Sequence, residues 1–189
     1  KHHDKFIFKG GLLLAHYLEI GRETIDLDFL VTKLKSEAPA IEKVVRDIVS
    51  ENLGDGLEYS WSSIEELSQP HMGYPGFRVS INVVCERMKD KIQLDIGVGD
   101  KVNAVEEEIE TFEYKGKPLF AGEISLQVYP VEAIFAEKLE TIISKGAINS
   151  RMKDFYDLKI LSQEFEFNGG NLSNAIKATF ERRGTSIPN

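Results

Sequence analysis

Two aspartates separated by one residue, with a glycine pair upstream, are the residues of this chain whose types and spacing point most clearly to chemistry. Asp26 and Asp28 lie in the segment TIDLDFLV, which is typical of a β-strand. Side chains alternate across a strand, so both carboxylates share one face. Adjacent carboxylates repel each other unless a cation lies between them, and Mg²⁺ is commonly held by one or two carboxylates together with substrate phosphates. The pair therefore predicts a divalent metal site.

The glycine pair supplies the second half of this predicted site. Gly10 and Gly11 open a short apolar helix, and the free backbone N–H groups at a helix start attract phosphate. A predicted turn at Gly21-Arg22 then leads into the aspartate strand, which brings helix start and strand to the same end of a compact unit. A lone Asp-x-Asp is more often a solvated strand face, and a glycine pair is more often a turn. The order of the segments favours a nucleotide-handling site over both alternatives.

A third carboxylate stands on the polar side of a later strand. In the segment KIQLDIGVG, residues 91–99, the apolar residues at every second position form one face, and Asp95 points to the other. Asp95 is therefore available as a third metal ligand or as a general base.

Periodicity predicts the elements that must position these side chains. Residues 36–54 show helical spacing of apolar residues, with Ser36 as a possible cap. Residues 57–63, 77–85 and 91–99 read as an antiparallel run of strands. Residues 103–127 show a weaker pattern and are interpreted mostly as connecting structure, with short strands at 111–114 and 123–128.

The last third of the chain is predicted to be helical, over residues 131–146, 150–163 and 169–184, with Ser150 as a cap for the second helix. The apolar face of that second helix includes Phe155 and Leu161. Asp154 and Asp157 are three apart and are neighbours on a helix. One interpretation is that they form a surface ion-pair network with Arg151 and Lys153, worth about 0 to 1 kcal/mol per exposed pair.

Composition excludes several classes of protein. With 189 residues, 42% of them hydrophobic, the chain can bury one good core. No apolar run approaches the roughly 20 residues of a membrane span, and no signal segment opens the chain, so we expect a cytoplasmic protein without a membrane partner. The single cysteine, Cys85, excludes an internal disulfide and a cysteine-based zinc site. The abrupt start suggests that the natural protein has residues upstream.

The net charge of −8 argues against broad adhesion to nucleic acid. Lysine and arginine nevertheless cluster in RMKDFYDLK and in KATFERR, so a polyanion contact is expected from the C-terminal third.

Four segments together resemble one protein family. The glycine pair followed by TIDLDFLV, then QLDIGVGD, AEKLETIISKG and RMKDFYDL, resembles the AbiEii/AbiGii abortive-infection nucleotidyltransferase toxins, over residues 6–161 and in the family's order. The resemblance implies an α+β fold with a mixed α/β sheet. It would comprise a nucleotidyltransferase core of the polymerase-β type over residues 1–128 and a helical C-terminal part over 129–189. The glycine-serine pair usual in the family is Gly10-Gly11 here, which removes a hydroxyl from the phosphate loop.

The resemblance also implies roles for individual residues. Asp26 and Asp28 would hold Mg²⁺, and Asp95 would be the third acidic residue near the attacking hydroxyl. Lys138 would meet the triphosphate, although a lysine between glutamates on a helix is commonly just a solvated surface residue. The other residues implied in catalysis or nucleotide binding are Gly10, Gly11, Arg22, Thr24, Lys153, Asp154 and Asp157.

The implied activity is Mg²⁺-dependent transfer of a nucleoside monophosphate from a nucleoside triphosphate to an acceptor hydroxyl. Such a transfer is an in-line displacement in which metals stabilise attacking and leaving oxygens, while a cation such as Lys138 or Arg22 neutralises the departing pyrophosphate. The resemblance suggests the toxin of a toxin–antitoxin or phage-defence pair, with a cognate antitoxin protein and an RNA acceptor, for which the 3′ end of tRNA is a candidate. The alternatives are transfer to a small molecule, as in antibiotic-modifying enzymes, and a catalytically silent nucleotide-binding module.

Overall fold

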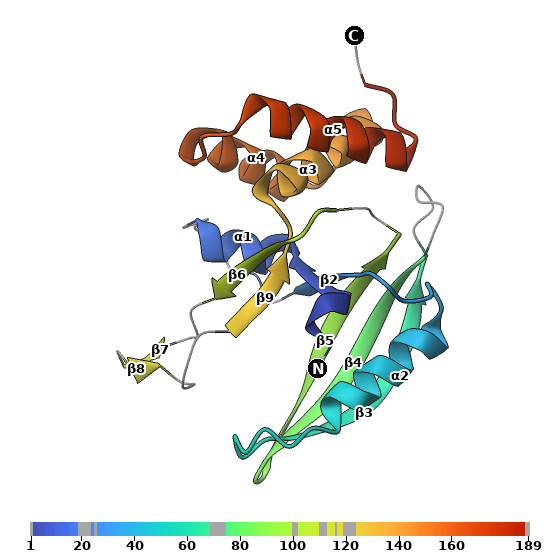
Figure 1. Ribbon diagram of the computed structural model, residues 1–189, viewed down its shortest axis with the longest axis vertical. Coiled ribbons are helices and arrows are strands. Elements are labelled where there is room, and N and C mark those ends of the chain that lie inside the picture. The colour runs from blue at the N-terminus through green and yellow to red at the C-terminus, as the bar shows by residue number, and fades with distance from the viewer. Residues whose placement is uncertain are drawn as a thin grey trace.

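A seven-stranded mixed β-sheet forms the centre of the molecule (Figure 1). The computed structural model describes residues 2–18, 24, 26–68, 75–99, 102–109, 113–115, 117–118 and 124–187. The strand order is β3-β4-β5-β2-β1-β9-β6, in which β2 runs parallel to β5, β1 runs parallel to β9, and the other neighbours are antiparallel. The strands of the sheet are β1 Phe6–Lys9, β2 Leu27–Val31, β3 Glu58–Leu67, β4 Gly76–Cys85, β5 Met88–Val98, β6 Val105–Ile109 and β9 Ile124–Val128.

The helices within the described residues are α1 Gly10–Tyr17, α2 Ala38–Val49, α3 Val131–Lys145, α4 Met152–Glu164 and α5 Gly169–Arg183, with short 3₁₀ segments η1 His3–Lys5 and η2 Gly146–Ile148. A separate two-stranded sheet consists of β7 Glu113–Tyr114 and β8 Lys117–Pro118. The predicted class, an α+β fold with a mixed sheet and a helical C-terminal part, is confirmed. No helix in the described ranges is long and apolar enough to cross a membrane.

One face of the sheet is covered by α2. Ile41 and Val45 on this helix are fully or almost fully buried and pack in one cluster with Phe77, Val79 and Ile96 of the sheet. The helix predicted over 36–54 is therefore present, but it is shorter at both ends. Glu37 and Arg151 occupy the N-cap positions of α2 and α4, so neither Ser36 nor Ser150 has the predicted capping role.

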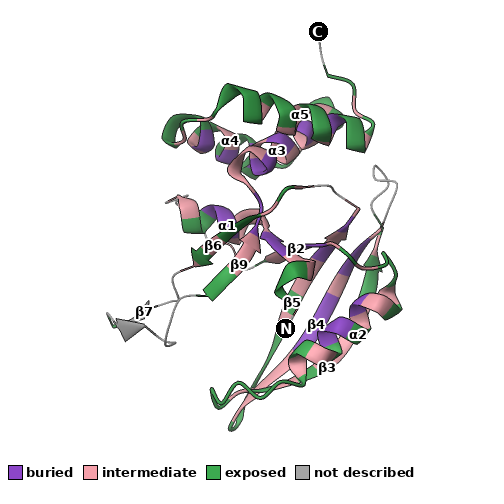
Figure 2. Ribbon diagram, viewed as in Figure 1, coloured by how far each residue is buried: buried purple, intermediate pink, exposed green. Residues whose placement is uncertain are grey.

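The other face packs against α1 and the C-terminal helices. Leu13 and Leu14 of α1 are fully buried with Ile7 and Leu30 of the sheet and Ile134 of α3. Figure 2 shows these buried segments running from the sheet up into the helices. Because α3 also packs against α4 and α5, the chain after β9 is a layer of helices above one end of the sheet.

The region interpreted as connecting structure contains an edge strand that the sequence pattern did not reveal. Residues Val105–Ile109 form β6, paired antiparallel with β9. Its acidic side chains are typical of an edge strand, where charge discourages pairing with another chain. They also mask the apolar alternation by which a strand is usually recognised.

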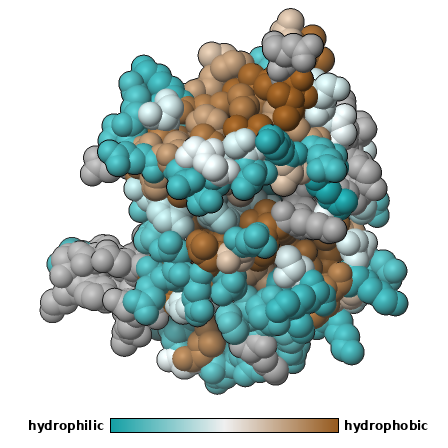
Figure 3. Space-filling view, turned by 45° about the horizontal axis from the view of Figure 1, so that its top comes forward, coloured by the Kyte–Doolittle hydropathy of each residue, from teal (hydrophilic) through white to brown (hydrophobic). Residues whose placement is uncertain are grey.

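The polarity of α4 differs from the prediction. Phe155 was expected on its buried face, but its exposed fraction is 42%, whereas Asp154 and Asp157 are buried at 1% and 0%. Exposed apolar residues also include Ile148 and Met152 before and at the start of α4. Figure 3 turns the end with the C-terminal helices forward and shows apolar side chains gathered on its surface.

Candidate active site

The register of the sheet places five charged side chains in one row. Lys9 on β1 is paired with Asp28 on β2, and Asp28 with Asp95 on β5. Asp95 in turn is paired with Arg78 on β4, and Arg78 with Glu65 on β3. Directly paired residues point to the same face of a sheet. The two aspartates are therefore neighbours, flanked on either side by a cation.

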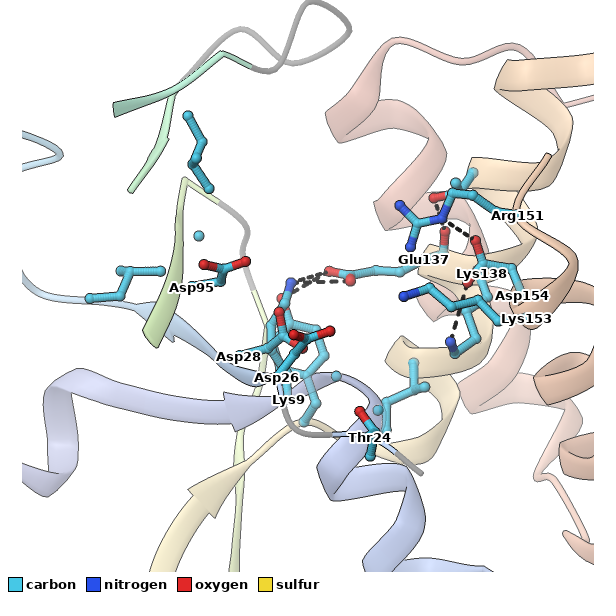
Figure 4. Close-up of a pocket in the computed structure, with 18 of the residues that line it drawn as sticks. Lys9, Thr24, Asp26, Asp28, Asp95, Glu137, Lys138, Arg151, Lys153 and Asp154 are labelled. Atoms are coloured by element: carbon cyan, nitrogen blue, oxygen red, sulfur yellow. Dashed lines mark hydrogen bonds and ion pairs between the residues drawn. The ribbon is translucent and has the colours of Figure 1, made fainter. Parts of the chain in front are cut away.

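A cavity of about 390 Å³ lies between this row and the C-terminal helices. Figure 4 shows Asp26, Asp28 and Asp95 on the sheet side and Lys138, Arg151 and Lys153 on the helix side. The charged and glycine residues that line the cavity are Lys9, Gly10, Gly11, Asp26, Asp28, Asp95, Gly97, Glu137, Lys138, Arg151, Lys153, Asp154 and Arg183, and Thr24 also lines it.

Gly10 allows the start of α1 to lie directly against Asp28. Its φ of 81° is a left-handed conformation that side chains rarely adopt. A Cβ atom at this position would collide with Asp28, lying 2.7 Å from both its Cβ and its Cγ atom. The predicted proximity of the helix start and the aspartate strand is thus present, and it depends on the absence of a side chain at residue 10.

Asp28 is a half-buried carboxylate with an unfavourable charge. Its pKa is raised to about 6, chiefly by burial and also by the negative charges of Asp95 and Asp26, against the opposing effect of Lys9 and Lys153. Asp26 itself is exposed. A cation placed between Asp26 and Asp28 would relieve this repulsion.

Asp95 is held by Arg78 in a two-point contact. Arg78 donates from Nε to Oδ1 and from Nη2 to Oδ2 of Asp95, both at 2.7 Å. This contact raises the pKa of Arg78 above its ordinary value. A bidentate pair fixes both position and orientation of the carboxylate. Arg78 was not recognised in the sequence, because its pairing with Asp95 depends on the β4–β5 register.

The helical wall of the cavity contains a buried group of charges. Lys138 Nζ on α3 lies 2.7 Å from Asp157 Oδ2 and 3.4 Å from Asp154 Oδ1, both on α4. Arg151 Nε lies 2.7 Å from the second oxygen of Asp154. The side chains of Lys138, Asp154 and Asp157 are 13%, 2% and 0% exposed, so this group is not a solvated ion-pair network.

A second charged group, absent from the sequence prediction, is centred on Glu137. Its carboxylate contacts Lys9 at 3.1 Å, accepts a hydrogen bond from the Tyr129 hydroxyl at 3.0 Å, and lies 3.3 Å from Arg183. Burial by itself would raise the pKa of Glu137, but Lys9, Arg183 and these hydrogen bonds hold it below its ordinary value. Arg183 ends the basic segment KATFERR, which was the one sequence signal for it.

The structure brings together most of the residues singled out in the sequence. Asp157 differs: it is buried beneath Lys138 and is not among the residues that line the cavity. Arg22 and the turn predicted at Gly21-Arg22 lie outside the described residues.

The carboxylates at the cavity fit a magnesium ion through two ligands. Among the residues that the structure describes, no group of three or more His, Cys, Asp or Glu side chains is arranged to hold a metal. Asp26 and Asp28 nevertheless offer the hard oxygen ligands that Mg²⁺ prefers, and Mg²⁺ commonly uses one or two carboxylates with water and substrate phosphates. Burial, together with the charges of Asp95 and Asp26, raises the pKa of Asp28, so a bound cation would favour its ionised form. Asp95, the third predicted ligand, also lines the cavity, and each of its oxygens accepts one hydrogen bond from Arg78.

Three solved structures share this fold. MenT4, a nucleotidyltransferase toxin of Mycobacterium tuberculosis, aligns with a TM-score of 0.57 and 17% identity over 91% of this chain and 55% of its own. A putative nucleotidyltransferase from Helicobacter pylori aligns with a TM-score of 0.52 and 18% identity over 95% of this chain and 70% of its own. JHP933, also from Helicobacter pylori, aligns with a TM-score of 0.51 and 18% identity over 95% of this chain and 68% of its own. At these identities the likeness concerns the fold.

Among curated protein sequences, none matches this chain. The model of a protein family, by contrast, matches residues 1–189, and its description is nucleotidyl transferase AbiEii toxin of type IV toxin–antitoxin systems. With the aspartate pair, the glycine-supported helix start and the facing cations in one cavity, the chain belongs to the AbiEii family of nucleotidyltransferase toxins.

Proposed function

We propose that this nucleotidyltransferase moves a nucleoside monophosphate from a nucleoside triphosphate to a hydroxyl group of RNA, with Mg²⁺ as its cofactor. The observation that carries the proposal is the polarity of the cavity. Asp26, Asp28 and Asp95 line the side formed by the sheet, whereas Lys138, Arg151 and Lys153 line the side formed by the helices. A metal-bound triphosphate requires carboxylates for the metal and cations for the phosphates in the same cavity.

The helical wall and the start of α1 would bind the triphosphate. Backbone N–H groups at Gly10 and Gly11 are suited to phosphate oxygens. Lys138, Arg151 and Lys153 would neutralise the charge that develops on the leaving pyrophosphate, and such groups act most strongly when they are already in place. Asp157 holds Lys138 from beneath, so we assign it a positioning role behind the cavity.

The sheet wall would hold the reacting centre. Asp26 and Asp28 would bind Mg²⁺, which supplies charge stabilisation at the phosphoryl oxygens. A carboxylate has about four lone-pair sites, and Arg78 engages only one on each oxygen of Asp95. Asp95 therefore retains the capacity to accept the proton of an acceptor hydroxyl while Arg78 keeps it in place.

The biological setting follows from the family. Type IV toxin–antitoxin systems pair a toxin with an antitoxin, so we propose a cognate antitoxin and an action in the cytoplasm. We also propose that residues 1–128 act as the nucleotidyltransferase core and that residues 129–189 form a helical part that completes the nucleotide site.

Incorporation of label tests the proposal directly. The protein is incubated with Mg²⁺, total cellular RNA and each of the four nucleoside triphosphates labelled at the α-phosphate. We expect labelled RNA with the wild type and none with Asp28→Asn, because the variant loses a metal-binding charge. Glu66→Gln, on the opposite face of the sheet, is the matched control and should label RNA normally. Full transfer by Asp28→Asn would show that the assignment of this carboxylate is wrong.

A further inference from the structure

Lys9 is a cation of the cavity that belongs to the sheet and not to the helical wall. It ends β1, directly before Gly10, and is paired with Asp28 on β2. Its side chain is 17% exposed and lines the cavity. The Nζ atom extends toward β5, where it lies 4.0 Å from the position that a Cβ atom at Gly97 would take. The sheet therefore places a positive charge beside Asp28, facing α3.

Three contacts hold this ammonium in one place. Lys9 Nζ donates to both carboxylate oxygens of Glu137 on α3, at 3.2 Å and 3.1 Å, as Figure 4 shows. It also lies 4.7 Å from the centroid of the Tyr129 ring, a distance typical of a cation–π contact. Tyr129 directly follows β9, is fully buried, and donates a hydrogen bond from its hydroxyl to Glu137 at 3.0 Å. The position of the ammonium is thus fixed by α3 and by the end of β9.

Stability alone does not require a charged pair at this place. Lysine loses much rotamer freedom when it is ordered, and it is seldom buried without a partner. Well-packed apolar residues often join two layers as well as a buried ion pair does, and the cluster of Ile7, Leu30 and Ile134 already joins the sheet to α3 in this way. A held ammonium adds a positive charge that is in position before a substrate binds. Such groups stabilise developing charge strongly, because they need no reorganisation during the reaction.

We propose that Lys9 contacts the phosphate chain of the nucleoside triphosphate and that Glu137 and Tyr129 position its ammonium for this contact. The inference rests on the proposed function, in which Asp26 and Asp28 hold the metal. Because Lys9 is paired with Asp28, its charge would lie next to the phosphate that the metal binds. The cations of the helical wall would meet the leaving pyrophosphate instead. Glu137 acts through Lys9 in this arrangement and is therefore a positioning residue.

The ammonium of Lys9 can be followed directly by nuclear magnetic resonance. Isotopically labelled lysine is incorporated into the whole chain, and the proton–nitrogen signals of the lysine ammonium groups are recorded. We expect a Lys9 signal in the wild type, identified by its loss from Lys9→Met, because the contacts with Glu137 and Tyr129 slow the exchange of its protons with water. The signal should shift when inorganic tripolyphosphate and Mg²⁺ are added, and it should disappear in Glu137→Gln.

Two results of this measurement would overturn the proposal. A Lys9 signal that is absent from the wild type, or unchanged in Glu137→Gln, would show that Glu137 does not position the ammonium. A signal that does not shift with excess tripolyphosphate would show that Lys9 does not contact phosphate.

Calorimetric titration with tripolyphosphate and Mg²⁺ measures the contribution of Lys9 to binding. We expect Lys9→Met to weaken binding by roughly 10-fold or more, because a hydrogen bond between charged groups is lost. Lys33→Met, which removes an exposed lysine paired with Asp4, is the matched control and should bind as the wild type does.

A double variant separates this contact from a loss of folding. Lys9→Met leaves Glu137 with one cation fewer, whereas Lys9→Met/Glu137→Gln removes both charges and should be closer to the wild type in stability. The double variant should still bind tripolyphosphate several-fold more weakly than Glu137→Gln does. Equal affinities of these two variants would show that the pair only joins the two layers.

Transfer kinetics test the positioning role separately. Glu137→Gln should lower kcat several-fold without raising KM for the nucleotide, because it removes a negative charge from the cavity while it releases the Lys9 ammonium. An unchanged kcat would show that Glu137 has a structural role only.

Failure of the proposed function has a different signature. If the wild type binds tripolyphosphate through Lys9 but transfers no label to RNA, the proposed reaction is wrong and the phosphate contact stands. If the wild type labels RNA and the double variant binds tripolyphosphate as tightly as Glu137→Gln does, the reaction stands and the role of Lys9 is wrong.

Discussion

Asp28 carries a negative charge that its surroundings compensate only in part. Burial raises its pKa to about 6, above an ordinary value near 4. The folded protein therefore binds this proton more tightly than the unfolded chain does. As pH rises from about 4 to about 6, Asp28 lowers the free energy of unfolding, and the full penalty applies above pH 6.

Because the ionised Asp28 lowers the free energy of unfolding, Asp28→Asn and the wild type should differ in stability above pH 6. Without Mg²⁺, the neutral asparagine should give the higher free energy of unfolding at pH 8, and the difference should nearly vanish at pH 4. Added Mg²⁺ at pH 8 should stabilise the wild type, since a ligand that binds only the native state raises stability, and should have little effect on the variant. Urea titrations at the two pH values measure both effects. Equal stability of the two proteins at pH 8 would show that the charge of Asp28 does not destabilise the fold.

Gly10 shows how a residue without a side chain controls this site. We predict that Gly10→Ala destabilises the protein and abolishes transfer, because its Cβ would displace the Asp28 carboxylate. Gly54→Ala is the control, because it places a side chain at a left-handed backbone position without a collision. Gly54 has a similar φ of 69°, but nothing lies within 4 Å of the position that a Cβ atom would take. The control should therefore lose only about 1 to 2 kcal/mol and keep its activity. Equal losses in the two variants would show that Asp28 is not displaced.

Helices α3 and α4 are joined by charge as well as by apolar packing. Lys138 contributes a cation from α3, and Asp154 and Asp157 contribute carboxylates from α4. A buried ion pair often stabilises a fold no more than well-packed apolar residues would, but removal of one partner leaves an uncompensated buried charge. The position of the Lys138 ammonium at the edge of the cavity thus depends on how α4 lies against α3.

We expect Asp157→Asn to lower the free energy of unfolding by about 3 kcal/mol or more. The matched control is Glu42→Gln, which breaks the exposed pair with Arg46 one turn away on α2 and should cost no more than about 0.5 kcal/mol. Chemical denaturation of the two variants and the wild type gives both values. A loss below 1 kcal/mol for Asp157→Asn would indicate that Asp154 alone suffices to hold Lys138.

Elements with regular apolar alternation were predicted well from the sequence. The strands β3, β4 and β5 and helices α2, α3 and α5 lie close to their expected positions because the apolar residues of each recur with the period of that element. The strand β6 and the polarity of α4 were not predicted. In α4 a charged residue is buried and an apolar one is exposed: Asp157 is buried in an ion pair with Lys138, while Phe155 is partly exposed.

At the scale of the whole molecule, the site is assembled from both ends of the chain. Glu137 on α3 contacts Lys9 at the end of β1 and Arg183 at the end of α5. Arg183 also lies 2.8 Å from Glu140, and Thr185 donates a hydrogen bond to the same carboxylate. The contact between Lys9 and Glu137 connects the proposed core with the proposed helical part at the cavity, so the proposed nucleotide site draws on both.

The sequence by itself determined the aspartate pair, the glycine-led helix start, the class of fold and the family, because each depends on the order and spacing of nearby residues. Only the tertiary structure decided that Asp95 is bound by Arg78, that Asp157 lies beneath Lys138 and outside the cavity, and that Lys9 and Arg183 meet at Glu137. Each of these contacts joins residues on different elements. Strand register and helix packing select such partners, and the local pattern of a chain carries no direct record of either.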